Sequence, residues 1–130
     1  MTVTALRVVT AMSTHCKSCK KKMPQVELLA HTFTAEQVAL YGVSTDLEET
    51  REVLTAYVRD HQPAYRVLVR APMTERTALR DHVRALYQDD LTPVSVVTDA
   101  GGRILATFPG VPSVSDLRRL LDEQAGTSEG

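Results

Sequence analysis

The chain has 130 residues, a formal net charge of −1, 43% hydrophobic residues and 24% charged residues. This ordinary balance predicts a single globular domain over residues 1–130, with a core from about 5 to 125 and a flexible tail over 126–130. The near-zero charge argues against nucleic acid or an anionic membrane surface as a partner. No apolar run approaches the ~20 residues that a membrane span needs. Because strand-like sequence begins by about Ala5, we also expect no signal peptide.

In the first half of the chain, apolar periodicity predicts alternating strands and helices. The expected elements are a buried strand over 5–11, a helix over 16–33, a buried strand over 38–43 and a helix over 47–60. The first helix carries an apolar stripe at steps of three and four residues: Cys19, Met23, Val26, Leu29 and Phe33. Pro24 is expected to kink this helix rather than end it, because the stripe continues beyond it. Thr45 and Glu48 are expected to cap the second helix.

The second half of the chain continues the alternation and ends in a hairpin followed by a helix. The expected elements are a strand over 65–69, a helix capped by Thr74 with Leu79, Val83, Leu86 and Tyr87 inward, strands over 94–98 and 103–108, and a last helix opened by Ser113 and Asp116. A turn at 99–102 makes the two late strands antiparallel. The helix between the first two strands makes those strands parallel. This order predicts an α/β sandwich built on a mixed sheet.

The only two cysteines, Cys16 and Cys19, lie between the first strand and the first helix. A C-x-x-C pair in this context is typical of a redox site. Free N–H groups at a helix N-terminus favour a thiolate at Cys16, and Cys19 lies one turn on, close enough to close a small disulfide. A structural pair without turnover is the alternative. No metal site is predicted, because zinc needs about four ligands and Lys20 stands where haem c attachment needs histidine.

We expect the two cysteines to differ in exposure. Cys19 lies on the apolar stripe and should be buried, whereas Cys16 precedes the stripe and should be exposed and reactive. His15 either donates to the Cys16 thiolate and tunes it, or is a solvated loop residue. The lysines over 17–22 either steer acidic partners or form a solvated helix face. The remaining histidines are expected on the surface: His31, His61 and His82.

Two segments of the chain resemble thioredoxin-fold proteins. Residues 6–24 are similar to the active-site segment of TlpA-like thiol–disulfide oxidoreductases, which has an apolar strand, a short loop, C-x-x-C, a basic residue and a proline, here Pro24. Residues 92–105 resemble the cis-proline, strand, glycine turn and next strand of that family. The resemblance spans about 5–125 and implies a thioredoxin fold, a mixed β-sheet flanked by helices on both faces, with a strand–helix insertion at about 65–87.

The resemblance also implies a function and a site. The Cys16–Cys19 pair would exchange disulfides with protein partners and an upstream redox protein, with Cys16 attacking, Cys19 resolving and no further cofactor. Thr92 and Pro93 would form a cis peptide against the disulfide, where the backbone of Thr92 pairs with substrate. Residues expected to tune the pair are His15, Lys17, Ser18 and Lys22. We expect a monomer, and an extracytoplasmic, periplasmic setting as an excised or leaderless domain, with a cytoplasmic protein as the alternative.

The sequence departs from the family pattern at several positions. Thr10 stands where thioredoxins have a buried acid, and Lys22 stands where many TlpA-like reductases have a glutamate. Met12 and His15 replace tryptophans, and Ser18 replaces a proline, so substrate class and redox potential stay open. One alternative is a Sco-like copper chaperone, although its loop histidine has no counterpart in residues 87–91. Another is a redox-idle interaction module with the same fold.

Overall fold

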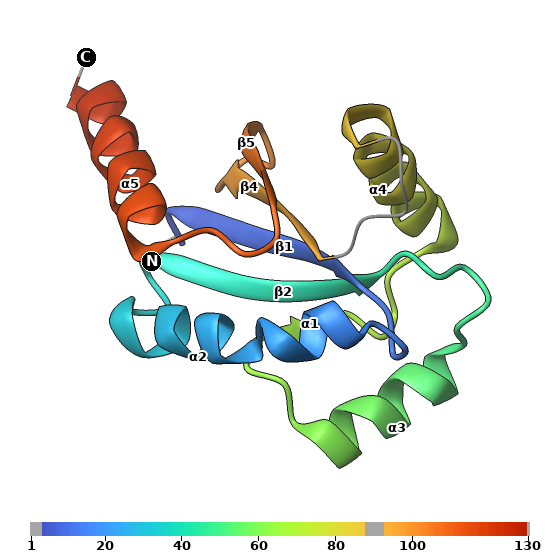
Figure 1. Cartoon of the computed structure of the whole chain (residues 1–130). Coiled ribbons are helices and arrows are strands. Elements are labelled where there is room, and N and C mark those ends of the chain that lie inside the picture. Colours follow the sequence, from blue (N-terminus) through green and yellow to red (C-terminus); the bar gives the residue numbers. More distant parts are fainter. Residues whose placement is uncertain (1–3, 88–92, 130) are drawn as a thin grey trace.

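The computed structural model describes residues 4–87 and 93–129 and contains a five-stranded sheet in the order β3-β2-β1-β4-β5 (Figure 1). The strands are β1 (Leu6–Met12), β2 (Val38–Ser44), β3 (Arg66–Val67), β4 (Val94–Asp99) and β5 (Ile104–Pro109). The helices are α1 (Lys17–Lys21), α2 (Met23–Thr32), α3 (Arg51–His61), α4 (Met73–Leu86) and α5 (Val114–Glu129). β1 pairs in parallel with β2 and antiparallel with β4, and β4 pairs antiparallel with β5. The mixed sheet that the element order predicts is therefore confirmed.

Helices cover both faces of this sheet. In Figure 1, α1, α2 and α3 lie below the sheet and α4 lies above it. The main core joins the sheet to α2 and α5 and contains Leu6, Val8, Leu29, Phe33, Val38, Val97, Leu117 and Leu120. On the opposite face, Val83 of α4 packs with Ala11 and Val94. Val8 and Ala11 are three residues apart in β1, so their side chains point to opposite faces.

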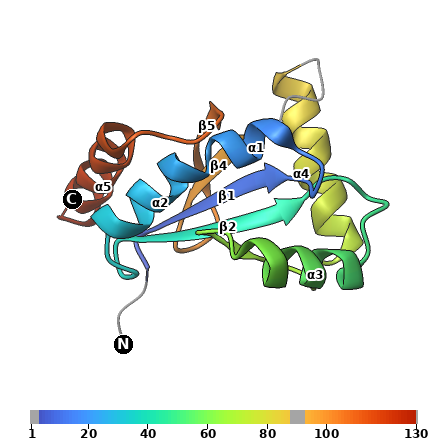
Figure 2. The same cartoon turned by 60° about the horizontal axis from the view of Figure 1, so that its bottom comes forward.

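The helix expected over 16–33 is divided into α1 and α2. Lys22 separates them with φ −88° and ψ −4°, and Pro24 occupies the first turn of α2, where its missing N–H group costs no helical hydrogen bond. The expectation that Pro24 only kinks a continuous helix was therefore wrong. The two helices still run in line along β1 (Figure 2), and the stripe stays inward, because Cys19, Val26 and Leu29 are buried.

Two elements after β2 are shorter than expected. α3 begins at Arg51, and its cap is Thr50, whose Oγ1 accepts a hydrogen bond from the N–H group of Val53 at 3.2 Å. The expected start near residue 47 was wrong because residues 45–50 form a loop that buries Glu49. β3 contains only two residues instead of the five expected over 65–69.

The predicted turn and cap in the last third of the chain are confirmed. One carboxylate oxygen of Asp99 accepts hydrogen bonds from the N–H groups of Gly101 and Arg103, both at 2.9 Å, which closes the turn between β4 and β5. At the start of α5, Ser113 and Asp116 cap each other reciprocally, with both N–H to side-chain oxygen distances at 3.1 Å. α5 extends to Glu129, so the backbone over 126–129 is helical, and the flexibility expected there stays a prediction.

The boundaries and inner face of α4 differ from the prediction. The helix follows Pro72, which makes no side-chain cap, so Thr74 is not the N-cap residue. Leu86 is 54% exposed, because the side chains that contact the sheet are those of Leu79, Val83 and Tyr87, spaced four residues apart. Within the described residues, no helix combines the length and the apolar character needed to cross a bilayer.

Gly42 in β2 allows a tyrosine ring to lie directly on the strand. A Cβ atom added at Gly42 would lie 2.7 Å from Cε1 of Tyr65, closer than side chains tolerate. Tyr65 is itself only 4% exposed and belongs to the apolar cluster that surrounds the two cysteines. The ring therefore has little room to move aside, and β2 needs a residue without a side chain at this position.

Replacement Gly42→Ala should lower the free energy of unfolding by about 1–3 kcal/mol, because the added methyl group overpacks the space filled by Tyr65. Urea denaturation measures the change. Gly101→Ala, at an exposed turn position, is the matched control and should change stability by less than about 0.5 kcal/mol. In a Tyr65→Ala background the cost of Gly42→Ala should disappear; an undiminished cost would show that the ring is not its cause.

A candidate active site at a buried disulfide

The site begins where β1 leaves the sheet. β1 ends at Met12, a short loop follows, and Cys16 is the N-cap residue of α1. Cys16 and Cys19 form a disulfide. The backbone N–H group of Cys19 donates a hydrogen bond to Sγ of Cys16 at 3.0 Å, while the N–H group of Cys16 donates to the carbonyl oxygen of Ser13 at 3.3 Å. This strand–loop–helix junction is the context expected for the C-x-x-C pair.

Both cysteines are largely covered. Cys19 is 3% exposed, as expected, but Cys16 is only 8% exposed, so the expectation of an exposed Cys16 was wrong. The reason is local, because the disulfide and the N–H group of Cys19 both draw Sγ of Cys16 inward from the N-cap position. The cluster that contains the disulfide comprises Met12, Val26, Tyr57, Tyr65 and Val67. Cys16 keeps the larger exposure of the pair.

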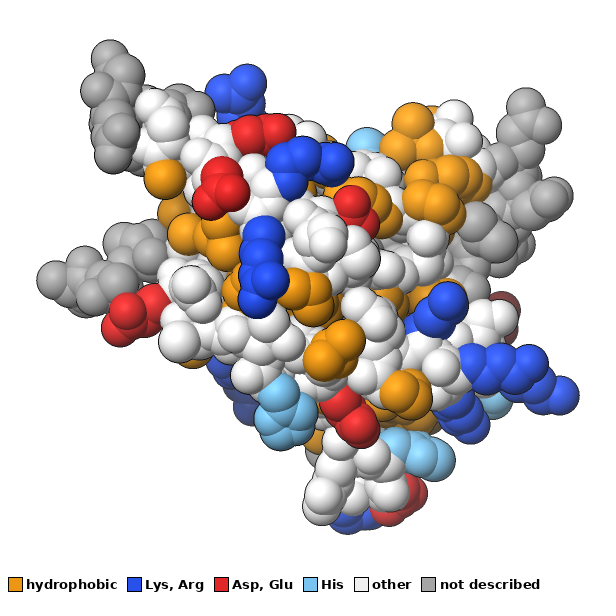
Figure 3. Space-filling model, turned by 60° about the vertical axis from the view of Figure 1, so that its left-hand side comes forward, with side chains coloured by type: hydrophobic (Ala, Val, Ile, Leu, Met, Phe, Trp, Pro, Cys, Tyr) orange, Lys and Arg blue, Asp and Glu red, His pale blue; other side chains and the backbone are white. Residues whose placement is uncertain are grey.

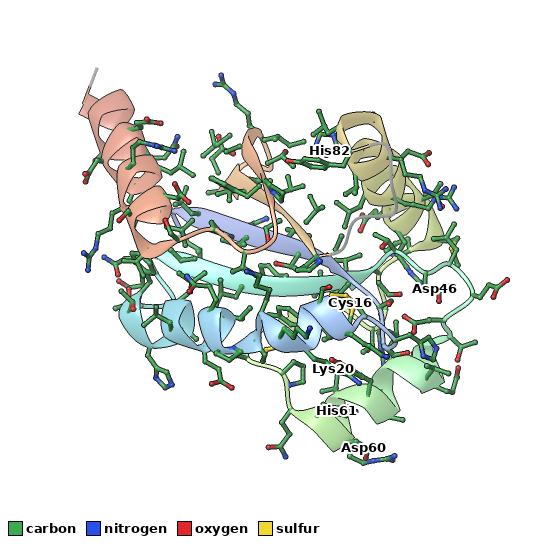
Figure 4. All side chains as sticks on the ribbon, viewed as in Figure 1. Cys16, Lys20, Asp46, Asp60, His61 and His82 are labelled. Carbon is green, nitrogen blue, oxygen red and sulfur yellow. A yellow bond between two sulfur atoms is a disulfide. The ribbon has the colours of Figure 1, made fainter. Side chains whose placement is uncertain are left out.

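The outer surface of the site is polar and basic. His15, Lys17, Ser18, Lys20, Lys21 and Lys22 are all exposed. Every lysine in the chain belongs to this set, and the other 11 basic residues are arginines. Figure 4 labels Cys16, at the start of the short helix α1, and Lys20, within that helix. The tuning roles assigned to His15, Lys17, Ser18 and Lys22 stay predictions; the first three adjoin a cysteine in the chain, and Lys22 follows Cys19 by three residues.

Pro93 lies at the same end of the sheet as residues 13–16, which we call the cysteine loop. Ala11 pairs with Val94 in the sheet, so Pro93 follows the register toward the Met12 end of β1. Pro93 is buried, and its carbonyl oxygen accepts a hydrogen bond from the N–H group of Gly110 at 2.8 Å. Thr92, and with it the Thr92–Pro93 peptide bond, lies outside the described residues. The cis-proline and the substrate-pairing backbone of Thr92 therefore stay predictions.

A neutral pair of hydroxyl groups lies at Thr10, the position where the resemblance in the sequence implies an acid in thioredoxins. Thr10 is 2% exposed, and its hydroxyl lies 2.9 Å from that of Ser95. The Ser95 hydroxyl also donates to the carbonyl oxygen of Gly110 at 2.7 Å. These hydrogen bonds satisfy both side chains without an ionisable group, so this position supplies no base to the site.

A buried acid lies elsewhere, at Glu49, and sequence reasoning did not find it. Glu49 is 5% exposed in the loop between β2 and α3. Its Oε2 accepts hydrogen bonds from the N–H group of Thr14, at 2.9 Å, and from the Thr14 hydroxyl. Its Oε1 accepts from the hydroxyl of Ser44 at 2.7 Å. Glu49 thus ties the loop that carries Cys16 to the end of β2.

Arg76 of α4 completes this buried polar network. Its side chain is also 5% exposed and donates to the carbonyl oxygens of Ser44 at 2.9 Å, Glu49 at 3.1 Å and Asp46 at 2.5 Å. The network connects α4, on one face of the sheet, to the loop before Cys16. The only sequence signal was an acidic residue in a loop and an arginine in a helix, patterns that usually indicate solvent exposure.

Two tyrosines lie beside the disulfide. Burial raises the pKa of Tyr65 above its ordinary value of 10.0, and Tyr57 adds a smaller effect in the same direction. Burial, followed by the negative charge of Glu49, also raises the pKa of Tyr57. The hydroxyl of Tyr65 has no hydrogen-bond partner among the described residues. The ring of Tyr57 packs against that of His61, with centroids 4.7 Å apart.

Metal binding has no visible basis in the part of the chain that the structure describes. Within 4–87 and 93–129, no group of three or more His, Cys, Asp or Glu residues could hold a metal ion. Of the histidines away from the cysteines, His31 and His61 are exposed as expected. His82 is only half-exposed, with Nε2 lying 3.2 Å from the hydroxyl of Thr107.

Comparison with solved structures identifies the class of fold. The chain is similar to a thiol–disulfide isomerase from Thermus thermophilus, with a TM-score of 0.65 and 21% identity over 91% of this chain and 78% of that one. It is similar to a thiol–disulfide isomerase from Corynebacterium glutamicum, with a TM-score of 0.62 and 19% identity over 95% and 82% of the two chains. A DsbE-type protein from Chlorobium tepidum gives 0.56 and 14% over 99% and 83%.

These likenesses show that the chain has the thioredoxin fold, as the resemblance in its sequence implied. No family model matches the chain, and no curated protein matches it in sequence. At these identities the comparisons establish the fold, so the activity must be argued from the cysteine pair and its surroundings.

Replacement Tyr65→Phe should leave stability at neutral pH unchanged or raise it, because the lost hydroxyl has no partner and its desolvation costs about 1–3 kcal/mol. Because the pKa of Tyr65 is raised in the fold, the unfolded chain loses its proton first, and stability falls as pH rises above about 10. Denaturation at neutral pH and at about pH 11 should therefore show a smaller alkaline loss in the variant. A neutral-pH loss above ~1 kcal/mol would reveal a partner for the hydroxyl.

Replacement Glu49→Gln should lower the free energy of unfolding by about 1–3 kcal/mol, because an amide N–H₂ group then faces donors from Thr14 or Ser44. The neighbouring Glu48→Gln, at an exposed position, is the control and should change stability by less than about 0.5 kcal/mol. Thermal or urea denaturation compares the two variants. Equal effects would mean that the buried carboxylate is not holding the cysteine loop.

Proposed function

We propose that the protein is a thiol–disulfide oxidoreductase that exchanges disulfides with protein partners through Cys16 and Cys19. The observation that carries the proposal is the disulfide itself, closed within a C-x-x-C pair at the junction of β1 and α1 in a thioredoxin fold. The N–H group of Cys19 points at Sγ of Cys16, which supports negative charge on that sulfur when the disulfide opens.

The exchange proceeds through a mixed disulfide. A thiolate of the partner attacks Sγ of Cys16, the bond between the cysteines breaks, and the sulfur of Cys19 leaves with the electron pair and takes a proton from solvent. A second thiolate of the partner then attacks the partner sulfur in the mixed disulfide, and Cys16 leaves as a thiolate. The partner is oxidised by two electrons and the cysteine pair is reduced by the same two electrons. The reverse sequence reduces a partner disulfide.

The two cysteines take different roles because their surroundings differ. Cys16 has the larger exposure, accepts a hydrogen bond at its sulfur and adjoins the exposed lysines, so it is the sulfur that a partner reaches. Cys19 lies on the buried stripe of α1 and α2, so it reacts only within the molecule. Because the structure places a neutral pair at Thr10 and Ser95, proton transfer to Cys19 is assigned to solvent.

The partners in this proposal are a protein with a disulfide or dithiol and an upstream redox protein that resets the pair. The solved structures of similar fold support this class of partner, since several of them are thiol–disulfide isomerases or interchange proteins. We place the reaction in an extracytoplasmic compartment, on the resemblance of residues 6–24 to TlpA-like proteins.

Replacement Cys19→Ser should trap a covalent complex between Cys16 and a model disulfide, because the attacking sulfur remains and the resolving sulfur is gone. Replacement Cys16→Ser should abolish exchange, because the remaining sulfur is covered. Mass spectrometry after mixing each reduced variant with the disulfide separates these outcomes. A stable adduct on Cys16→Ser but not on Cys19→Ser reverses the two roles. No adduct on either variant, together with a wild type that does not cycle with dithiothreitol, means that the protein is redox-idle.

A further inference from the structure

We propose that the substrates of this protein carry acidic residues beside their reactive sulfur, and that the lysines of α1 select them. This inference rests on the proposed function and names its substrate class. The lysines concerned are Lys17, Lys20, Lys21 and Lys22, which we call the lysine cluster. All four are exposed, and together they surround the buried Cys19 on α1 and at its end.

The lysine cluster is an uncompensated positive charge. No acidic residue lies in the first turn of α1, and none of the four ammonium groups forms an ion pair with a carboxylate of the described residues. Removing these four lysines from the 15 basic residues leaves 11 against 16 acidic residues, so the rest of the chain is acidic. Four positive charges therefore lie within six consecutive residues at the disulfide, while the rest of the chain carries a net negative charge.

This arrangement carries a local cost, which argues against a chance distribution. Lys17 and Lys21 are four residues apart on a helix of five residues, and like charges at this spacing destabilise a helix. Elsewhere the chain uses arginine, and Arg59, Arg80 and Arg119 each form an ion pair with an aspartate. Arg59 lies 3.1 Å from Asp60, and Arg119 lies 3.8 Å from Asp116. In Figure 3, blue and red side chains are interspersed in the upper part of the molecule.

The cluster also reaches the edge where a bound peptide would lie. Lys22 extends toward Gly110, since its Cε lies 4.0 Å from the place of a Cβ atom on that residue. The N–H group of Gly110 in turn holds the carbonyl oxygen of Pro93, at the end of the sheet next to the cysteine loop. A peptide that places its sulfur on Cys16 would therefore have lysine ammonium groups along α1 and at Gly110.

Charge selection follows from these positions. Exposed charges act over a Debye length of about 10 Å at 0.1 M salt, which covers the residues flanking a cysteine in a bound peptide. Attraction of this kind raises association rates and favours partners of opposite sign, and salt weakens it. Lysine suits the task, because its ammonium group is a mobile point charge that does not demand one fixed carboxylate geometry. The cluster would thus accept acidic sequences without requiring a single motif.

The test uses three synthetic peptides that share one intramolecular disulfide, with glutamate, glutamine or lysine at the flanking positions. The reduced protein is mixed with each, and the second-order rate of disulfide reduction is measured at low and high salt. Each rate is divided by the rate for 2-mercaptoethanol with the same peptide, which removes the intrinsic reactivity of the disulfide. The Glu peptide should react at least about fivefold faster than the Gln peptide at low salt, the Lys peptide slower, and high salt should compress the differences.

Variants locate the cause. The double replacement Lys20→Gln/Lys21→Gln should remove most of the preference for the Glu peptide. The charge-matched control Arg118→Gln/Arg119→Gln changes α5, which packs at the far end of α2, and should keep the preference. Ratios between peptides are compared, because any change in thiolate reactivity affects all three alike. The inference would be overturned if the wild-type protein reduced the three peptides at equal normalised rates, or if both double variants lost the preference for the Glu peptide to the same extent. In either case, reduction of the Gln peptide would still support the proposed oxidoreductase activity. If no peptide is reduced, the proposed function itself is wrong and the inference falls with it.

Discussion

The backbone groups of β1 must be satisfied on both edges, and the position of every element at the site follows from that requirement. β2 pairs with one edge in parallel, which demands a crossover, and α1 and α2 supply it. β4 pairs antiparallel with the other edge from Leu6 to Ala11. The end of β1 at Met12 therefore releases the loop to Cys16 beside the start of β4, where Pro93 lies. The pairing of the strands therefore determines where the cysteine pair and Pro93 lie.

Periodicity predicted the elements that the sheet holds directly. Sequence reasoning recognised the strands at 5–11 and 38–43 and the buried stripe through Val26 and Leu29. In these elements the apolar residues follow a pattern that indicates which side chains are buried. The redox pair was recognised because Cys16 and Cys19 are only three positions apart, so their contact depends on local structure alone. The error at Cys16 arose because the stripe describes a helix, whereas an N-cap side chain turns back toward the third residue.

The buried polar network could not be read from the chain. Glu48 and Glu49 are adjacent acids, yet only Glu49 is buried. Its partners Thr14 and Arg76 lie far away in the sequence, and their meeting depends on how the loops after β1 and β2 pass each other. For the same reason α3 begins at Arg51 and not near residue 47 as predicted, because residues 45–50 form the loop that takes part in this network. Contacts of this kind between distant residues leave no periodic pattern in the sequence from which they could be predicted.

Charge is divided between the inside and the outside of the site. Inside the protein, the carboxylate of Glu49 accepts hydrogen bonds from Thr14 and Ser44 and holds the cysteine loop in place. In front, the lysine cluster is solvated and without ion-pair partners among the described residues. The buried hydroxyls of Thr10 and Ser95 contribute no charge. Replacements on the outer surface can therefore alter which partner is met without disturbing the loop that positions Cys16.

The disulfide joins residues only three apart, and this has a thermodynamic consequence. A cross-link that closes so short a loop removes less chain entropy from the unfolded state than one that spans elements. In the cycle that connects folded and unfolded, oxidised and reduced forms, the extra ease or difficulty of reducing the folded protein equals the stability difference between its two redox forms. That difference depends on the apolar cluster around the disulfide, which joins α1 to Met12 of β1 and Val67 of β3. Replacements in this cluster can therefore change the redox potential and the stability of the fold together, because the same residues contribute to both.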